Sequence, residues 1–230
     1  VNLIADYDTS SAAYKVQGDI DSLNINHFMP AQPLYNLSLN LNAKGAGIDF
    51  MSKKSSGEFD LHLNELKYDQ LAFRKFNLNA LLNSGKLATK ISSDNPIVTG
   101  TIDGYYMLTD PSLNLNYRVD IEDIDLYKLG IAKQRIKDPV NITADLITDN
   151  DSVCLTINSG DFSFHFDAHQ SFNELMDQST LLLTSFMDQL KKKDIDYANL
   201  QKHLPEAHLA WQFGQKNVIS SLLSQNKINY

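Results

Sequence analysis

The stretch Tyr35-Asn36-Leu37-Ser38-Leu39-Asn40-Leu41-Asn42-Ala43 alternates apolar and polar residues without a break. Successive side chains of a β-strand point to opposite faces, so this pattern predicts a strand with one apolar face and one solvated face. The same period of two returns along most of the first 168 residues. It recurs at 14–20, 59–63, 76–80, 87–91, 98–102, 113–121, 140–146, 153–157 and 162–166.

Turn signals separate these segments. They include Asn83-Ser84-Gly85, Asp138-Pro139 and Asn158-Ser159-Gly160. The connections are too short for crossover helices, which favours antiparallel meanders over parallel strands. A weak internal repeat of alternating Leu and Asn, as in Ser112-Leu113-Asn114-Leu115-Asn116, fits this reading.

The period changes near residue 170. Apolar residues then follow helical spacing to Leu190, Ser171 to Glu174 has the form of a capping box, and Lys191 to Lys193 suit a helix C-terminus. A second helix is expected over 197–203 and a strand over 209–213. Asn217 is expected to cap a third helix to residue 223, and a strand to begin at Ile228.

The predicted fold class is therefore mainly β. We expect an elongated, curled, antiparallel-rich sheet that forms an open trough, with an α-helical insert near the C-terminal part. The divisions are residues 1–169 for the trough segment, 170–204 for the helical insert, and 205–230 for the return to strand and short helix. Since the sequence starts at Val1 and stops at Tyr230, we expect it to be a piece of a longer chain.

Composition argues against several classes of function. The formal net charge is −8, which repels phosphate backbones, so no nucleic-acid partner is expected. The short basic clusters, such as Lys53-Lys54, are interpreted as solvated faces or helix ends. The lone Cys154 lies in an apolar run and is interpreted as a small buried hydrophobe. We see no apolar run long enough to span a membrane and no signal peptide, so any membrane contact is expected through parts outside this sequence.

No recognised motif carries catalytic or metal chemistry. The sequence has no complete phosphate-binding glycine loop, no His-Glu-x-x-His helix and no nucleophile elbow. His165 and His169 share a strand face but are about 13 Å apart along it, too far to share one ion unaided. We therefore predict no enzyme, no metal and no cofactor.

A long sheet with one apolar face must cover that face with another sheet, a helix or an acyl chain. One long helix cannot cover some ten strands, so we expect a curled sheet whose exposed apolar strip is a lipid site. The alternative is a closed β-sandwich or solenoid with a structural or adhesive role at the cell surface. The predicted groove lining is Leu37, Leu39, Leu41, Phe59, Leu61, Leu63, Phe76, Leu78, Ile102, Leu113, Leu115 and Tyr117.

The helical insert presents an apolar stripe that is expected to be hidden from water. We predict that it docks on an apolar edge or mouth of the sheet and acts as a cap or gate. The predicted docking residues are Phe172, Leu175, Met176, Leu182, Leu183, Phe186, Met187 and Leu190.

The order of these signals resembles the TamB family, the AsmA-like translocation and assembly proteins of Gram-negative envelopes, and especially its Bacteroidetes-type members. The resemblance is carried by Ser38 to Gly45, Glu65 to Tyr68, Ile124 to Gly130 and Gly160-Asp161-Phe162, followed by an insert ending at His203-Leu204-Pro205. It covers most of the chain through degenerate patterns. The helical insert is less usual for the trough of such proteins.

This resemblance implies a periplasmic location within a protein anchored in the inner membrane. It also implies a groove that moves phospholipid or another acyl-chain lipid toward the outer membrane. A role in outer-membrane protein assembly, with a BamA-type barrel as a partner, is implied in the same way.

Overall fold

The computed structural model describes residues 1–110, 112–192 and 194–225. The strands are β1 (Asn2–Asp8), β2 (Ala13–Leu23), β3 (Leu34–Ala46), β4 (Ser56–Tyr68), β5 (Leu71–Phe73), β6 (Phe76–Asn83), β7 (Lys86–Asn95), β8 (Val98–Met107), β9 (Leu115–Ile124), β10 (Ile142–Thr148), β11 (Val153–Ser159), β12 (Phe162–Ala168) and β13 (Ala207–Gln212). The helices are η1 (Ile25–His27), α1 (Phe172–Lys192), α2 (Tyr197–Gln201) and α3 (Val218–Gln225).

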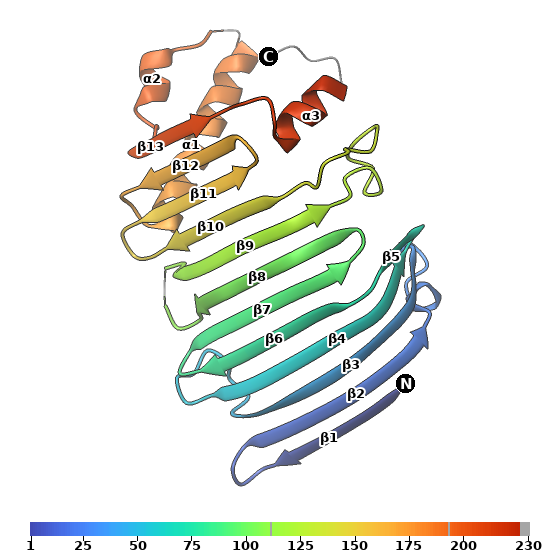
Figure 1. The fold of residues 1–230 in the computed structure, drawn as a ribbon. Helices are drawn as coiled ribbons and strands as arrows, with labels where there is room; N and C mark the ends of the chain where they lie inside the picture. The colour runs from blue at the N-terminus through green and yellow to red at the C-terminus, as the bar shows by residue number, and fades with distance from the viewer. Residues whose placement is uncertain (111, 193, 226–230) are drawn as a thin grey trace.

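All the described strands belong to one antiparallel sheet of 13 strands. Each strand pairs with its neighbour in the chain, except that β5 pairs only with β4 and β6 continues the sheet from β4. Figure 1 shows a single twisted layer with β1 at one end and β13 at the other. The sheet is open, and the predicted mainly β fold with a late helical insert is confirmed.

The strand register places apolar residues opposite apolar residues on neighbouring strands. Leu41 on β3 lies opposite Leu61 on β4, which lies opposite Leu78 on β6, and the row continues through Ile91 and Ile102. Because strand side chains alternate between faces, this one row fixes an apolar face for the whole sheet.

The opposite face is polar and internally paired. Lys90, Asp103, Arg118 and Asp145 lie opposite one another on β7 to β10, so their charges alternate along the row. Opposite charges facing each other across strands are stabilising. This face needs no cover from another layer.

The buried hydrophobic residues of the described chain are few, and apart from Leu82 and Ile97 they lie toward its C-terminal part. One cluster contains Leu126, Ala132 and Val140 from the β9–β10 connection, against which Val218 and Leu222 of α3 pack. The other contains Val153 of β11, Ala168 of β12 and Leu175 of α1. The helices therefore cover part of the C-terminal region of the sheet, while the end strand β13 is exposed along its whole length.

Predicted helix caps are present. Ser171 and Glu174 form the capping box, with Ser171 N donating to Glu174 Oε2 at 3.0 Å and Glu174 N to Ser171 Oγ at 3.3 Å. Asn217 Oδ1 accepts from Ser220 N at 2.8 Å at the start of α3. Asp196 caps α2 by accepting from Asn199 N at 3.0 Å.

Several boundaries differ from the sequence prediction. β1 and β5 were not anticipated, and β9 begins at Leu115 rather than Leu113. β10 begins at Ile142 rather than Val140, because Val140 N donates to the Asp123 side chain at 3.0 Å. The second helix ends at Gln201 rather than 203, and the strand predicted at Ile228 lies outside the described residues.

Candidate functional site: an open apolar face

The apolar side of β2 to β9 is the candidate site, and we call it the open apolar face. Cross-strand pairing places its side chains on one surface. Its residues are Val16, Ile20, Leu39, Leu41, Ala43, Phe59, Leu61, Leu63, Phe76, Leu78, Ala80, Leu87, Ile91, Ile102, Tyr106, Leu115, Tyr117, Val119 and Ile121.

The open apolar face has no second layer over it. These residues are half-buried, although they occupy the position that a sheet normally buries in a core. Leu82 of β6 lies in the same rows and is buried. The extensive contacts of β2 to β8 are with neighbouring strands of the same sheet, apart from η1 against β3. The shielding of these side chains therefore comes from one another, and their outer surfaces face solvent.

The dimensions of this face suit an extended hydrocarbon chain. From β2 to β9 there are six strand-to-strand steps, which at about 4.8 Å each give roughly 29 Å. One leaflet of a bilayer contributes half of a hydrocarbon core of about 30 Å, or roughly 15 Å. An acyl chain laid across the strands therefore fits within the face.

Two tyrosine rings on this face occupy the space above glycines, which have no side chain of their own. A Cβ added to Gly57 would be 2.6 Å from the Tyr14 hydroxyl, and one added to Gly104 would be 2.8 Å from Tyr117 Cδ1. The Tyr117 hydroxyl is also 2.9 Å from Thr89 Oγ1, which gives both polar groups a partner. The Tyr117 ring thus adds apolar area without an unsatisfied polar atom.

Helix α1 packs its first turn on the apolar side near the C-terminal end of the sheet. Leu175 is 8% exposed and packs with Val153 and Ala168, while Phe172 and Phe166 lie against the same cluster. In Figure 1, α1 lies behind β11 and β12. The first turn of α1 thus covers the apolar side around Val153 and Ala168, whereas Leu209 and Trp211 of β13, in the same rows, are 46% and 67% exposed.

The expectation that the sheet hides the whole stripe of α1 is wrong. Leu175 is buried and Phe172 and Leu182 are half-buried, but the other stripe residues are exposed: Met176, Leu183, Phe186, Met187 and Leu190. The physical reason is the direction of the helix, which meets the sheet with its first turn only. Beyond that turn α1 contacts α2, where Asn199 Oδ1 accepts from Ser185 Oγ and Gln189 Nε2.

The structure brings most of the predicted lining residues together. Leu39, Leu41, Phe59, Leu61, Leu63, Phe76, Leu78, Ile102, Leu115 and Tyr117 all belong to the open apolar face. Leu37 lies opposite Leu23 at the irregular end of β3, and Leu113 lies in the loop before β9.

Sequence reasoning left other residues out of the lining. Val16, Ile91 and Val119 lie in the same rows as the predicted residues. Their period-two pattern was visible in the sequence, so parity alone could have included them. Tyr14 needed the structure, because its position over Gly45 and Gly57 depends on three different strands.

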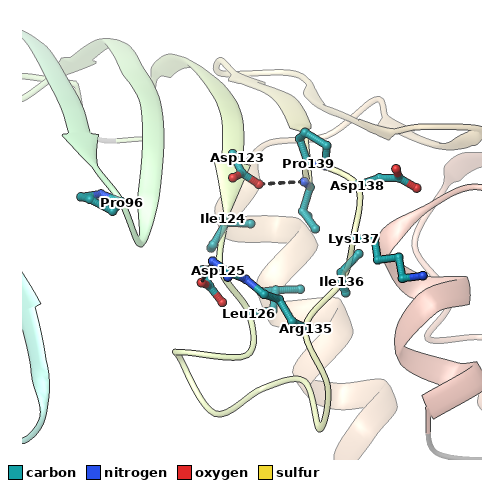
Figure 2. Close-up of a pocket in the computed structure, with 11 residues that line it drawn as sticks. Pro96, Asp123, Ile124, Asp125, Leu126, Arg135, Ile136, Lys137, Asp138 and Pro139 are labelled. Carbon is teal, nitrogen blue, oxygen red and sulfur yellow. Dashed lines mark hydrogen bonds and ion pairs between the residues drawn. The ribbon is translucent and has the colours of Figure 1, made fainter.

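A separate pocket of about 340 Å³ lies where β9 ends, beside the segment 135–140. Figure 2 shows Asp123 bonded to the backbone of that segment, with Arg135 beside Asp125. A hydrogen bond from Lys128 N, together with the charges of Arg135 and Lys128, lowers the pKa of Asp125. Because these carboxylates already hold their own loop in place, they do not form a free acid–base pair.

Among the described residues, no helix is long and apolar enough to cross a membrane. No group of three or more His, Cys, Asp or Glu side chains in the same part of the chain is placed to hold a metal ion.

Comparison of the chain with protein-family models, curated proteins and solved structures found no match.

Proposed function

We propose that the open apolar face binds the acyl chains of lipids, and that this chain is a non-enzymatic segment of a periplasmic bridge protein. In this proposal phospholipid moves along the face toward the outer membrane, where the protein supports outer-membrane biogenesis and protein assembly. The resemblance to TamB proteins supplies the location and the BamA-type partner, and the geometry supplies the binding surface.

One observation carries the proposal: the rows of aliphatic side chains through Leu41, Leu61 and Leu78 are continuous, and no second layer covers them. A contiguous exposed apolar surface of this size on a folded protein marks an interaction site. Its many similar contacts favour a ligand that slides, since no single position on the face holds a chain much more firmly than its neighbours.

The alternative proposal is a closed sandwich or solenoid with a structural role. A sandwich requires two sheets with facing apolar sides. All the described strands belong to a single sheet, and this supports the lipid-binding proposal over the sandwich.

The test is photocrosslinking of a diazirine-bearing fatty acid to the purified protein, combined with mass spectrometry of copurified lipid. Leu78→Asn places an amide on the open apolar face, and Leu81→Asn makes the same change on the opposite face of the same strand. Leu81 is already 50% exposed and points away from the site. Both variants are compared below their unfolding temperatures.

We expect Leu78→Asn to reduce crosslinking severalfold and Leu81→Asn to leave it unchanged. Crosslinked peptides are expected from β3, β4 and β6. The proposal is overturned if no acyl chain crosslinks or copurifies, or if the two variants lose crosslinking equally.

A further inference from the structure

The loop between β3 and β4 presents three large apolar side chains to solvent. Ile48 is 72% exposed, Phe50 53% and Met51 58%. They occur within four consecutive residues at the end of two long strands. Single exposed apolar residues are ordinary, but three at the tip of one loop form a local exposed apolar cluster.

The loop is held in this shape by its own hydrogen bonds. Asp49 O accepts from Ser52 N at 2.9 Å and from Ser55 Oγ at 2.6 Å, and Asp49 Oδ1 accepts from Met51 N at 3.1 Å. Gly47, with φ of +79°, donates its N–H to Ala12 O at 2.9 Å. Exposure of the apolar side chains is therefore built into the fold.

Two lysines stand directly beside the apolar tip. Lys53 and Lys54 are both exposed, and with Asp49 they give residues 47–55 a net charge of 2 − 1 = +1. The whole chain has a formal net charge of −8. This loop is thus locally cationic on an anionic molecule.

We propose that residues 47–55 form a membrane-interface anchor that recognises an anionic phospholipid bilayer. Ile48, Phe50 and Met51 enter the boundary between headgroups and acyl chains, and Lys53 and Lys54 stay at the level of the lipid phosphates. Apolar side chains flanked by basic residues are the combination by which interfacial segments bind anionic membranes. This inference is independent of the proposed lipid-binding role of the open apolar face.

The size and charge of the tip favour a bilayer over a protein partner. A stable protein interface buries roughly 800 Å² on each side, which three loop residues do not supply. Interface cores are also depleted in lysine, whereas this tip carries a lysine pair at its edge. A bilayer needs neither a large matched surface nor a fixed orientation of those two charges.

The experiment is cosedimentation of the protein with vesicles of phosphatidylcholine alone and of phosphatidylcholine with 30% phosphatidylglycerol (a composition of about 7:3, chosen to supply the anionic charge). The first variant is Ile48→Ser/Phe50→Ser/Met51→Ser, and the second is Lys53→Glu/Lys54→Glu. The matched control is Phe28→Ser/Met29→Ser, since these residues are 70% and 52% exposed on the β2–β3 connection, at the opposite ends of the strands.

We expect the unmodified protein and the control variant to bind the anionic vesicles and to bind neutral ones much less. Both loop variants should bind weakly. Each lysine removed should weaken binding roughly fivefold at low salt, and added salt should reduce that difference. Thermal melting of each variant checks that the fold is retained.

Insertion depth gives a second readout. A bimane probe at Met51→Cys in a Cys154→Ser background should shift to the blue on anionic vesicles, and one at Met29→Cys, at the opposite ends of the strands, should not. Equal vesicle binding by the loop variants and the unmodified protein would overturn the proposal. It would also be overturned if the loop substitutions reduced self-association of the protein but not its binding to vesicles. Both loop variants should still crosslink the diazirine-bearing fatty acid through β3, β4 and β6, which separates this test from that of the open apolar face.

Discussion

Tyr117 on β9 reaches across β8 to Thr89 on β7, with 2.9 Å between its hydroxyl and Thr89 Oγ1. Gly104 lies beneath the ring on the intervening strand, and pairs with both residues in the register. Three strands are thus tied together on the apolar side by one aromatic side chain and one hydrogen bond.

Replacing Tyr117 with Phe should separate the two contributions of this side chain. The ring over Gly104 remains, while the hydrogen bond to Thr89 is lost, which should cost about 1 kcal/mol of unfolding free energy. Acyl-chain crosslinking should not fall, because the apolar area is retained. Urea denaturation measures the free energy of unfolding. A drop in crosslinking would contradict the proposal that the Tyr117 ring contributes only apolar contact area to the open apolar face.

Gly104→Val should be more damaging than Tyr117→Phe. A Cβ at Gly104 meets Tyr117 Cδ1 at 2.8 Å and crowds Asn116 O, so both the ring and the β8–β9 pairing must shift. We expect a loss of about 1 to 3 kcal/mol, typical of overpacking, and reduced amide protection on β9. Unchanged stability would contradict this expectation, because movement of the ring alone does not relieve the contact with Asn116 O.

The docking of α1 can be tested at its first turn. Leu175→Ala should destabilise the helix against the sheet by about 2 to 5 kcal/mol, since Leu175 is buried between Val153 and Ala168. Leu183→Ala removes the same atoms from the same helix where the side chain is 62% exposed, and should change stability by less than about 0.5 kcal/mol. Limited proteolysis within α1 should report the difference.

Simultaneous unfolding of α1 and all strands in Leu175→Ala would make the helix an integral core element. Selective release of α1 would support a movable cover at this end of the apolar side. Leu183 and Phe186 are predicted from the sequence to dock the helix, but both side chains are exposed and Leu175 is the residue that packs on the sheet.

Asn95 is a second site where a single side chain holds separate segments. It is 1% exposed, accepts from Ile97 N at 2.7 Å, and donates to Ala72 O and Arg74 O at 3.3 and 3.2 Å. Asn95→Ala should cost about 1 to 3 kcal/mol because it leaves these buried backbone groups without partners. Asn83→Ala, at an exposed position on β6, is the control, and equal effects would contradict the assignment.

Asp161 predicts a pH dependence at the start of α3. Its carboxylate accepts from Asn217 Nδ2 at 2.8 Å and from the N–H groups of Lys216 and Gln215. The Asn217 side chain, followed by the Lys216 backbone, lowers the pKa of Asp161 below its ordinary value of 3.8. A lowered pKa in the folded state means that this stabilisation is complete above pH 3.8 and is lost as the pH falls through the folded value.

Hydrogen exchange at Ser220 and Ser221 should therefore accelerate relative to the β6 amides as the pH drops below about 4. Asp161→Asn should show the fast exchange already at pH 7. The side-chain NH2 group of the substituted asparagine would face three other hydrogen-bond donors, which are Asn217 Nδ2 and the N–H groups of Lys216 and Gln215. If exchange at α3 in this variant matched the unmodified protein, the carboxylate would not be what holds the segment.

Much of the architecture could be predicted because period two fixes which side chains share a face. Leu41, Leu61 and Leu78 needed only parity and antiparallel order to be placed in one row. The alternation of apolar and polar residues does not show at which residue the hydrogen bonds to the neighbouring strand begin. The pattern therefore places Leu113 in the strand, although it lies in the loop before β9. Val140 also looked like a strand residue, but the Asp123 carboxylate takes its N–H.

The helix illustrates a different limit. Its stripe from Phe172 to Leu190 was readable from spacing, and so was its capping box. The direction in which it leaves the sheet depends on the β12–α1 connection and on α2, and neither is encoded in the periodicity of the helix itself. Burial of Leu175 and exposure of Leu183 therefore could not be distinguished from the sequence.

Meander connectivity has a consequence for how such a sheet changes in length. Since nearly every strand bonds only to its predecessor and successor in the chain, the molecule is close to one-dimensional, and its stability is a sum of local terms along the sheet. A duplicated or deleted hairpin would preserve strand direction, the facing of every other side chain and the pairing of all remaining strands. Genetic gain or loss of hairpins could then set the reach of the apolar surface without redesign of what remains.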